Sequence, residues 1–176
     1  MNSRPLPTLA AMRHAPIDAP GRCYGRADLL PSISHEAAID RIPRDQDANL
    51  IWSSPAERCR GPGALQAART GVSHRIDARL HELDFGQWEN RPWDELPRAE
   101  LDAWGAAWEH EAPPGGEALP ALEARVRGWH AELHPGARHL LIAHAGVVRA
   151  LWVIRHGCAW PEAMDRPVPH LTLLEL

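Results

Sequence analysis

The sequence contains no lysine: all 19 of its basic residues are arginine, against 23 acidic residues. The resulting formal net charge of −4 argues against nucleic acid or an anionic membrane as the main partner. No segment approaches the roughly 20 consecutive apolar residues of a membrane-spanning helix, and the first residues lack the apolar core of a signal peptide. We therefore expect no nucleic-acid partner and no membrane association.

Cysteine is scarce as well. Cys23, Cys59 and Cys158 are far apart in the sequence, odd in number and without a C-x-x-C pair. This pattern argues against a disulfide framework and favours reduced thiols in a cytoplasmic protein. The 176 residues, 44% hydrophobic and 24% charged, are typical of a globular chain. We expect one domain over residues 1–176.

Short apolar runs alternate with segments of helical periodicity. The predicted strands are 7–13, 49–53, 72–77, 140–143 and 167–176. Helices are predicted after Ser34 and Ser54, and over 97–108, 117–133 and 146–155. The alternation predicts a layered α/β domain with a largely parallel sheet.

The helix after Ser54 carries two local signals. Ser54-Pro55-Ala56-Glu57 has the form of a capping box with proline at the first helical position. Gly61-Pro62-Gly63 follows, and because proline removes a backbone donor we expect a kink or break before residues 64–69. Such a break would shift Arg58.

Two histidines follow apolar strands directly. Arg13-His14 ends the first predicted strand, and His144 ends the fourth. Ligands of parallel sheets bind outside the carboxyl ends of the strands, so we expect His14 and His144 to meet at one edge of the sheet although 130 residues separate them in the sequence.

Six short pieces, in order along nearly the whole chain, resemble the motifs of the histidine phosphatase superfamily, whose fold is phosphoglycerate mutase-like. Each piece is a weak signal alone, and the ordered set is specific. The stretch from Cys23 to Asp28 and the short length are most similar to α-ribazole phosphatase-type members. The pieces are Arg13-His14; Gly21-Arg22-Cys23-Tyr24-Gly25-Arg26-Ala27-Asp28; Ser53-Ser54-Pro55-Ala56-Glu57-Arg58; Leu80-His81-Glu82 with Gly86 and Trp88-Glu89; Pro114-Gly115-Gly116-Glu117; and His144-Ala145-Gly146.

The resemblance implies a three-layer sandwich with a mostly parallel central sheet flanked by helices, and a phosphohistidine mechanism. His14 would be the nucleophile and Glu82 the proton donor to the leaving group. Arg13 and Arg58 would bind the phosphoryl oxygens, and His144, if protonated, would add a third positive charge. Arg22 and Ala145 complete the predicted phosphate and substrate contacts. The implied mechanism uses no metal or other cofactor.

Arg155-His156-Gly157 matches the superfamily's most quoted tripeptide better than Arg13-His14-Ala15 does. It follows a predicted helix rather than a strand, so we interpret it as a helix end with Gly157 as the cap.

The implied partner is a small phosphate ester, hydrolysed without metal, with α-ribazole 5′-phosphate of cobalamin biosynthesis as the favoured substrate. Three alternatives stay open: a broad-specificity small-molecule phosphatase, a phosphoglycerate mutase-like phosphotransferase, and a catalytically silent phosphate-ester-binding or regulatory protein. Product analysis separates hydrolysis from transfer, and an assay on a generic aryl phosphate separates both from the silent protein. The sequence predicts no oligomeric state.

Overall fold

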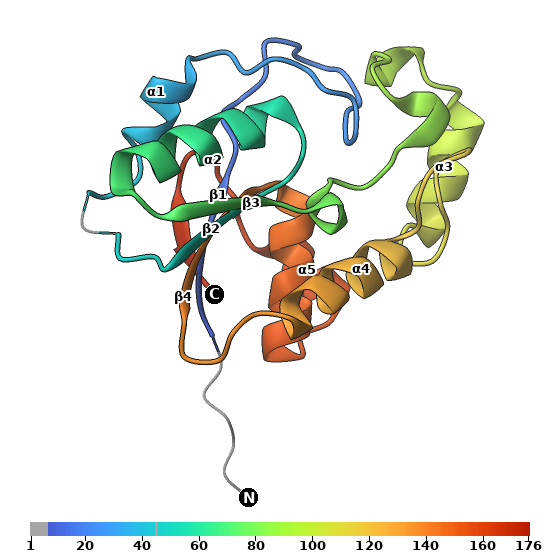
Figure 1. Cartoon of the computed structure of the whole chain (residues 1–176). Helices are drawn as coiled ribbons and strands as arrows, with labels where there is room; N and C mark the ends of the chain where they lie inside the picture. The colour runs from blue at the N-terminus through green and yellow to red at the C-terminus, as the bar shows by residue number, and fades with distance from the viewer. Residues whose placement is uncertain (1–6, 45) are drawn as a thin grey trace, which may run out of the picture.

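The computed structural model describes residues 7–44 and 46–176. Five strands form one sheet in the order β3-β2-β4-β1-β5 (Figure 1). Neighbours pair in parallel from β3 to β1, whereas β5 pairs antiparallel with β1. The predicted α/β class with a mostly parallel sheet is therefore confirmed. The strands are β1 (Thr8–Arg13), β2 (Leu50–Ser53), β3 (Ser73–Ile76), β4 (Arg138–Ala143) and β5 (Leu173–Glu175).

Helices cover both faces of the sheet, which gives three layers (Figure 1). The alternation of side chains along β1 shows how: Leu9 and Ala11 pack in the core shared with α4 and α5, and Ala10 and Met12 pack in the core beneath α1 and α2. The helices are α1 (His35–Ile39), α2 (Glu57–Thr70), α3 (Arg98–Ala107), α4 (Leu119–Ala131), α5 (Ala145–His156) and α6 (Trp160–Asp165), with 3₁₀ turns η1 (Ala78–Leu80), η2 (Gly86–Trp88) and η3 (Trp93–Glu95).

The predicted break in the second helix is wrong, because α2 runs continuously through Pro62. Gly61 and Gly63, which flank Pro62, allow histidine side chains from neighbouring elements to pack closely against the helix. A Cβ atom on Gly61 would lie 2.0 Å from Cε1 of His35, and one on Gly63 would lie 2.6 Å from Nε2 of His74. Tertiary packing stabilises most helices in proteins, and here it maintains α2 despite the backbone donor that Pro62 lacks.

The predicted capping box is wrong as well. The cap residue of α2 is Ala56, without a side-chain cap, and the helix begins at Glu57. The carboxylate of Asp28 accepts the Glu57 N–H at 2.9 Å, and the Ser54 hydroxyl lies 2.8 Å from Nε2 of His144. The serine side chain therefore contacts the edge of the sheet where His144 lies.

Other predicted boundaries hold or shift. Ser34 caps α1 by accepting the Ala37 N–H at 3.2 Å, and Gly157 caps α5 in the left-handed region at φ 66°. The predicted strand 167–176 is reduced to β5, because prolines at its start cannot donate to a ladder. The short helix α6 was not predicted.

None of the helices in the described part of the chain has the length and apolar character needed to cross a bilayer.

Candidate active site

His14 and His144 meet at the carboxyl edge of the sheet, as their positions after strands predict. β1 and β4 are neighbours, with Arg13 in register with Ala143. The next residue of each strand is the histidine, and their ring centroids lie 5.1 Å apart. Both side chains are buried, with 2% and 1% of their surface exposed.

The contacts of His14 define its tautomer. Nδ1 lies 2.6 Å from the Ala15 carbonyl oxygen, and since a carbonyl only accepts, Nδ1 carries the proton. Nε2 is then an acceptor, and Nε of Arg58 donates to it at 3.4 Å. Burial, and then the charge of Arg58, lowers the pKa of His14 from 6.5 to about 3. At neutral pH the ring is therefore uncharged, with an unprotonated Nε2 whose lone pair accepts the long hydrogen bond from Arg58.

Arg58 is fully buried and held by backbone carbonyls. Its Nη1 donates to the Ala27 oxygen at 2.7 Å, and its Nη2 donates to the Gly25 oxygen at 2.6 Å. The guanidinium also lies 5.4 Å from the centroid of the Tyr24 ring. The continuous helix α2 thus brings Arg58 to His14, and the displacement expected from a helix break does not occur.

The loop that holds Arg58 is itself bound by Glu89. The Glu89 carboxylate accepts the N–H groups of Gly25 at 3.0 Å, Arg26 at 2.9 Å and Ala27 at 3.0 Å. It also accepts the Phe85 N–H at 3.0 Å. One carboxylate therefore joins the loop under Arg58 to the segment that follows Glu82.

His144 is uncharged in this site. Burial lowers its pKa well below the usual value, and the neighbouring His14 and Arg58 lower it further. Its Nε2 lies 2.8 Å from the Ser54 hydroxyl, and its Nδ1 is buried without a hydrogen-bond partner. The third positive charge expected from His144 is therefore absent at neutral pH.

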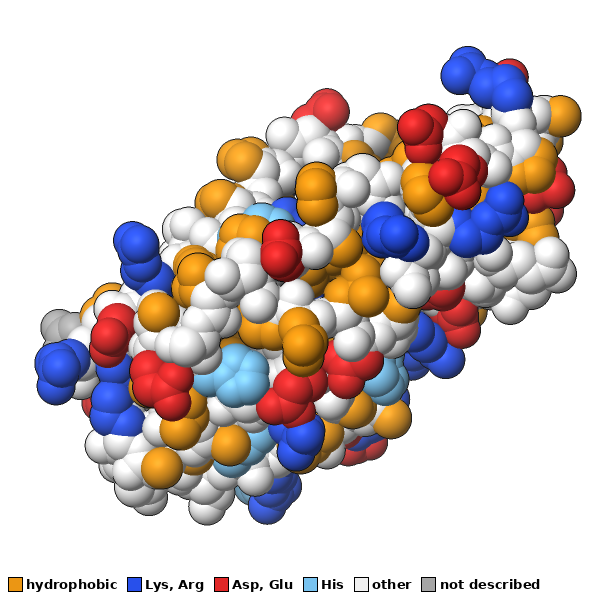
Figure 2. All heavy atoms as spheres, turned by 90° about the horizontal axis from the view of Figure 1, so that it is seen from above, with side chains coloured by type: hydrophobic (Ala, Val, Ile, Leu, Met, Phe, Trp, Pro, Cys, Tyr) orange, Lys and Arg blue, Asp and Glu red, His pale blue; other side chains and the backbone are white. Residues whose placement is uncertain are grey.

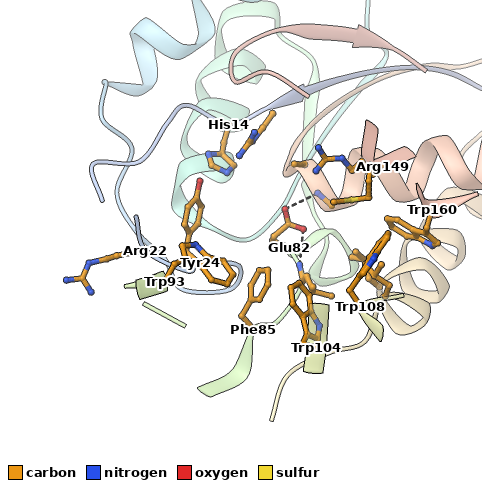
Figure 3. Close-up of a pocket in the computed structure, with 17 residues that line it drawn as sticks. His14, Arg22, Tyr24, Glu82, Phe85, Trp93, Trp104, Trp108, Arg149 and Trp160 are labelled. Carbon is orange, nitrogen blue, oxygen red and sulfur yellow. Dashed lines mark hydrogen bonds between the residues drawn. The ribbon is translucent and has the colours of Figure 1, made fainter. Parts of the chain in front are cut away.

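Glu82 lies at the amino end of α5. Its Oε2 accepts the Gly146 N–H at 3.0 Å, and its Oε1 accepts the Leu83 N–H at 2.9 Å. Arg125 of α4 fixes the preceding backbone by donating to the carbonyls of residues 79, 81 and 82. Glu82 and His14 line the same cavity, of about 240 Å³ (Figure 3).

Three other predicted residues also border this cavity. Arg13 lines it and donates through Nη1 to the Val168 oxygen at 3.0 Å, and Ala145 lines it at the first turn of α5. Arg22 reaches the rim, but its guanidinium donates to the Asn90 carbonyl and points away from His14 in Figure 3. The structure therefore places Arg22 at the rim of the cavity and away from His14, and the substrate or phosphate contact predicted for it stays a prediction.

The family model of the histidine phosphatase superfamily (branch 1) matches residues 32–176. The chain belongs to this superfamily. The match begins after Arg13 and His14, so the position of His14 beside Arg58 and His144 is an independent observation.

Relatives within the superfamily include named phosphatases. The chain is 27% identical to the adenosylcobalamin/alpha-ribazole phosphatase of Escherichia coli over 78% of this chain and 66% of that protein. It is 33% identical to the glucosyl-3-phosphoglycerate phosphatase of Mycobacterium tuberculosis, over 81% and 72% of the two chains. The crystal structure of the alpha-ribazole phosphatase of Shigella flexneri superposes with a TM-score of 0.84 at 26% identity, covering 94% and 88%. Together these findings support a phosphatase enzyme.

Two parts of this candidate site were not identified from the sequence. One is a pair of basic side chains. Nδ1 of His170 lies 2.7 Å from the His14 carbonyl oxygen, and Arg149 of α5 lines the cavity. The i, i+4 spacing of Arg149 from Ala145 was a usable signal, because it places both on one face of α5. His170 follows no motif and was not predictable.

The second missed part is an aromatic wall. Trp104 and Trp108 lie within the helix predicted over 97–108, and here they form one side of the cavity (Figure 3). The aromatic wall consists of Tyr24, Phe85, Trp93, Trp104, Trp108 and Trp160. Among the described residues, no group of three or more His, Cys, Asp and Glu side chains is arranged to hold a metal ion.

Proposed function

We propose that this protein hydrolyses phosphate monoesters through a phosphohistidine intermediate on His14. One observation carries the proposal: the unprotonated Nε2 of a buried, neutral His14 lies 3.4 Å from Nε of Arg58, and His14 lines a cavity together with Glu82. A neutral imidazole nitrogen is the form that can attack phosphorus.

The reaction proceeds in two displacements. Nε2 of His14 attacks phosphorus, the bond from phosphorus to the ester oxygen breaks, and Glu82 as a carboxylic acid gives its proton to the leaving oxygen. Water then attacks the phosphohistidine, its proton passes to Glu82, and the N–P bond breaks to release phosphate. The Nδ1–H bond to the Ala15 carbonyl stabilises the cationic ring while it carries the phosphoryl group.

Charge on the transferring group is balanced by arginine and by the helix. The transition state spreads negative charge over the equatorial oxygens, and Arg13 and Arg58 offer planar donors to them. The amino end of α5, at Ala145, adds the positive end of the helix dipole. No step in this scheme requires a metal ion.

The substrate we propose is α-ribazole 5′-phosphate, as in the names of the Escherichia coli and Shigella flexneri relatives. The aromatic wall supports this choice because it offers apolar faces to an aromatic base next to the phosphate site. The glucosyl phosphoglycerate named for the Mycobacterium tuberculosis relative would need polar partners for its sugar hydroxyls. We further propose that residues 1–176 form one domain and that it acts in the cytoplasm, where the free thiols of Cys23, Cys59 and Cys158 would stay reduced.

The test is phosphate release in excess chelator from α-ribazole 5′-phosphate and from sugar, nucleotide and glycerate phosphates. Wild type is compared with His14→Ala and with His156→Ala, the latter an exposed histidine at the end of α5. We expect preference for α-ribazole 5′-phosphate, loss of turnover in His14→Ala and wild-type rates in His156→Ala.

Each other outcome has a defined meaning. The same variant pattern with another preferred ester keeps the phosphatase and rejects the substrate. Isomerised phosphoglycerate without free phosphate indicates a phosphotransferase. A folded wild type that releases phosphate from no ester rejects the enzyme and leaves a binding protein.

A further inference from the structure

Unlike most of the other described arginines, Arg149 forms no direct salt bridge, although the Glu82 carboxylate lies close enough to offset part of the decrease in its pKa that burial causes. Arg79 bonds the carboxylates of Asp77 and Glu132, and Arg125 bonds that of Glu117. Arg149 is half-buried, its Nε is buried without a hydrogen-bond partner, and no carboxylate forms a salt bridge with it in the described part of the chain. An unpaired charge removed from water is costly, which suggests that an absent group completes it.

The position of Arg149 indicates what that group is. It lies four residues after Ala145 on the same face of α5, and helical side chains lean towards the amino end. Figure 3 shows its guanidinium directed along the first turn of α5, beside Glu82 and towards the side where His14 lies. Arg13 lines the same cavity. Two guanidinium groups that share a cavity repel each other until an anion binds between them.

We propose that Arg149 is a further phosphate-binding residue, which donates to the phosphoryl oxygens of the bound ester. This inference deepens the proposed function and rests on it, because the phosphoryl group is the ligand. Arg149 supplies the third positive charge that His144, neutral in this site, does not.

The direction of its pKa agrees with this role. Burial, together with the charge of Arg13, lowers the pKa of Arg149, and Glu82 opposes that effect. Glu82 is the proposed donor to the ester oxygen, and this oxygen is bonded directly to phosphorus. A cation beside Glu82 is therefore next to the phosphoryl group rather than next to the far end of the substrate.

The test measures the dissociation constant of inorganic phosphate by calorimetry at constant ionic strength. Arg149→Met removes the charge at similar length, and Arg149→Lys keeps the charge without the planar donors. Arg155→Met is the matched control, since Arg155 lies on the same helix but donates to His130 and to the Pro7 carbonyl, outside the cavity. We expect phosphate binding to weaken tenfold or more in Arg149→Met, less in Arg149→Lys, and not in Arg155→Met.

A thermal unfolding curve gives a second readout. Because Arg149 has no carboxylate partner to lose, Arg149→Met should unfold at the wild-type temperature or above it. A residue that merely supported the fold would show the opposite pattern, with lower stability and unchanged phosphate affinity.

Two results would overturn the inference: phosphate binding within twofold of wild type in Arg149→Met, or a loss confined to esters with a carboxylate in the leaving group, such as 3-phosphoglycerate. These results are separable from failure of the proposed function. A wild type that binds phosphate but hydrolyses no ester contradicts the function, whereas ester hydrolysis that is unaffected in Arg149→Met contradicts only the role of Arg149.

Discussion

Acidification should destabilise this protein through His14 by an amount that can be worked out. In the unfolded chain the ring takes up a proton near pH 6.5, but in the folded protein its pKa is about 3. The unfolded state therefore binds more protons between these values, and the free energy of unfolding falls as pH decreases through this window. His14 is 2% exposed, so solvent screening does not reduce the effect. At pH 5 its contribution is a loss of about 2 kcal/mol.

The variant His14→Asn isolates this contribution. Its amide nitrogen can take the place of Nδ1 and donate to the Ala15 carbonyl, and it does not titrate. A histidine with a lowered pKa that lies away from His14, such as His139, destabilises both proteins equally in acid. The difference between wild type and variant in their pH response therefore belongs to His14.

The assay is urea unfolding at pH 7.5 and pH 5 in buffer without phosphate, with linear extrapolation to water. Wild type should lose about 2 kcal/mol more than His14→Asn between the two pH values. His156→Asn is the control for removing an exposed histidine from the chain. Equal losses in wild type and His14→Asn would refute the assignment of a neutral, buried His14.

Two further substitutions test how the site is held together. Glu89→Gln places an amide nitrogen among backbone N–H donors, so we expect the free energy of unfolding to fall by about 2 kcal/mol in urea unfolding and turnover to fall as Arg58 loses its support. In Gly146→Ala a Cβ atom would lie 2.2 Å from Oε1 of Glu82. Because Glu82 must then move, turnover of alkyl phosphates should fall by about 100-fold. Turnover of nitrophenyl phosphate should fall less, because the nitrophenolate leaving group needs less protonation. Thermal unfolding of Gly146→Ala should be unchanged or shifted upward, since alanine favours the helix by about 1 kcal/mol; a large loss of stability would contradict this explanation.

The elements that could be predicted are those whose signal is local and repeated. Apolar runs placed β1, β2 and β4, and the 3–4 spacing of Leu119, Leu122, Val126 and Trp129 placed α4, where all four are buried. The errors occurred where a distant residue decides the local structure. Ser54 has the sequence of a helix cap, but its hydroxyl is used by His144, which lies 90 positions away. Pro62 stays within a helix because histidines from α1 and β3 pack against its neighbouring glycines.

In the candidate site, too, the features with a local sequence signal could be predicted, and those that depend on distant residues could not. His14 and His144 could be placed together because both follow strands whose ends meet, and Arg58 could be assigned by resemblance. The charge state of His144 could not be predicted, since it depends on burial and on how near His14 and Arg58 lie. For Arg149 the one available signal is its spacing of four residues from Ala145, because an arginine within an apolar helix otherwise has the same sequence pattern whether it faces a cavity or solvent.

In the proposed site the histidines and the arginines have different roles, because the histidines are neutral and the arginines are charged. Both histidines are neutral, so they act through the lone pair of His14 and through hydrogen bonds of fixed direction. In His144, Nε2 can accept the Ser54 O–H, which leaves the proton on Nδ1, a buried nitrogen without a hydrogen-bond partner among the described residues. Positive charge then comes from arginine, which cannot be deprotonated at working pH. A site that relied on protonated histidine for charge would also protonate its nucleophile. Charge from Arg13, Arg58 and Arg149 strengthens phosphate binding and leaves Nε2 of His14 unprotonated.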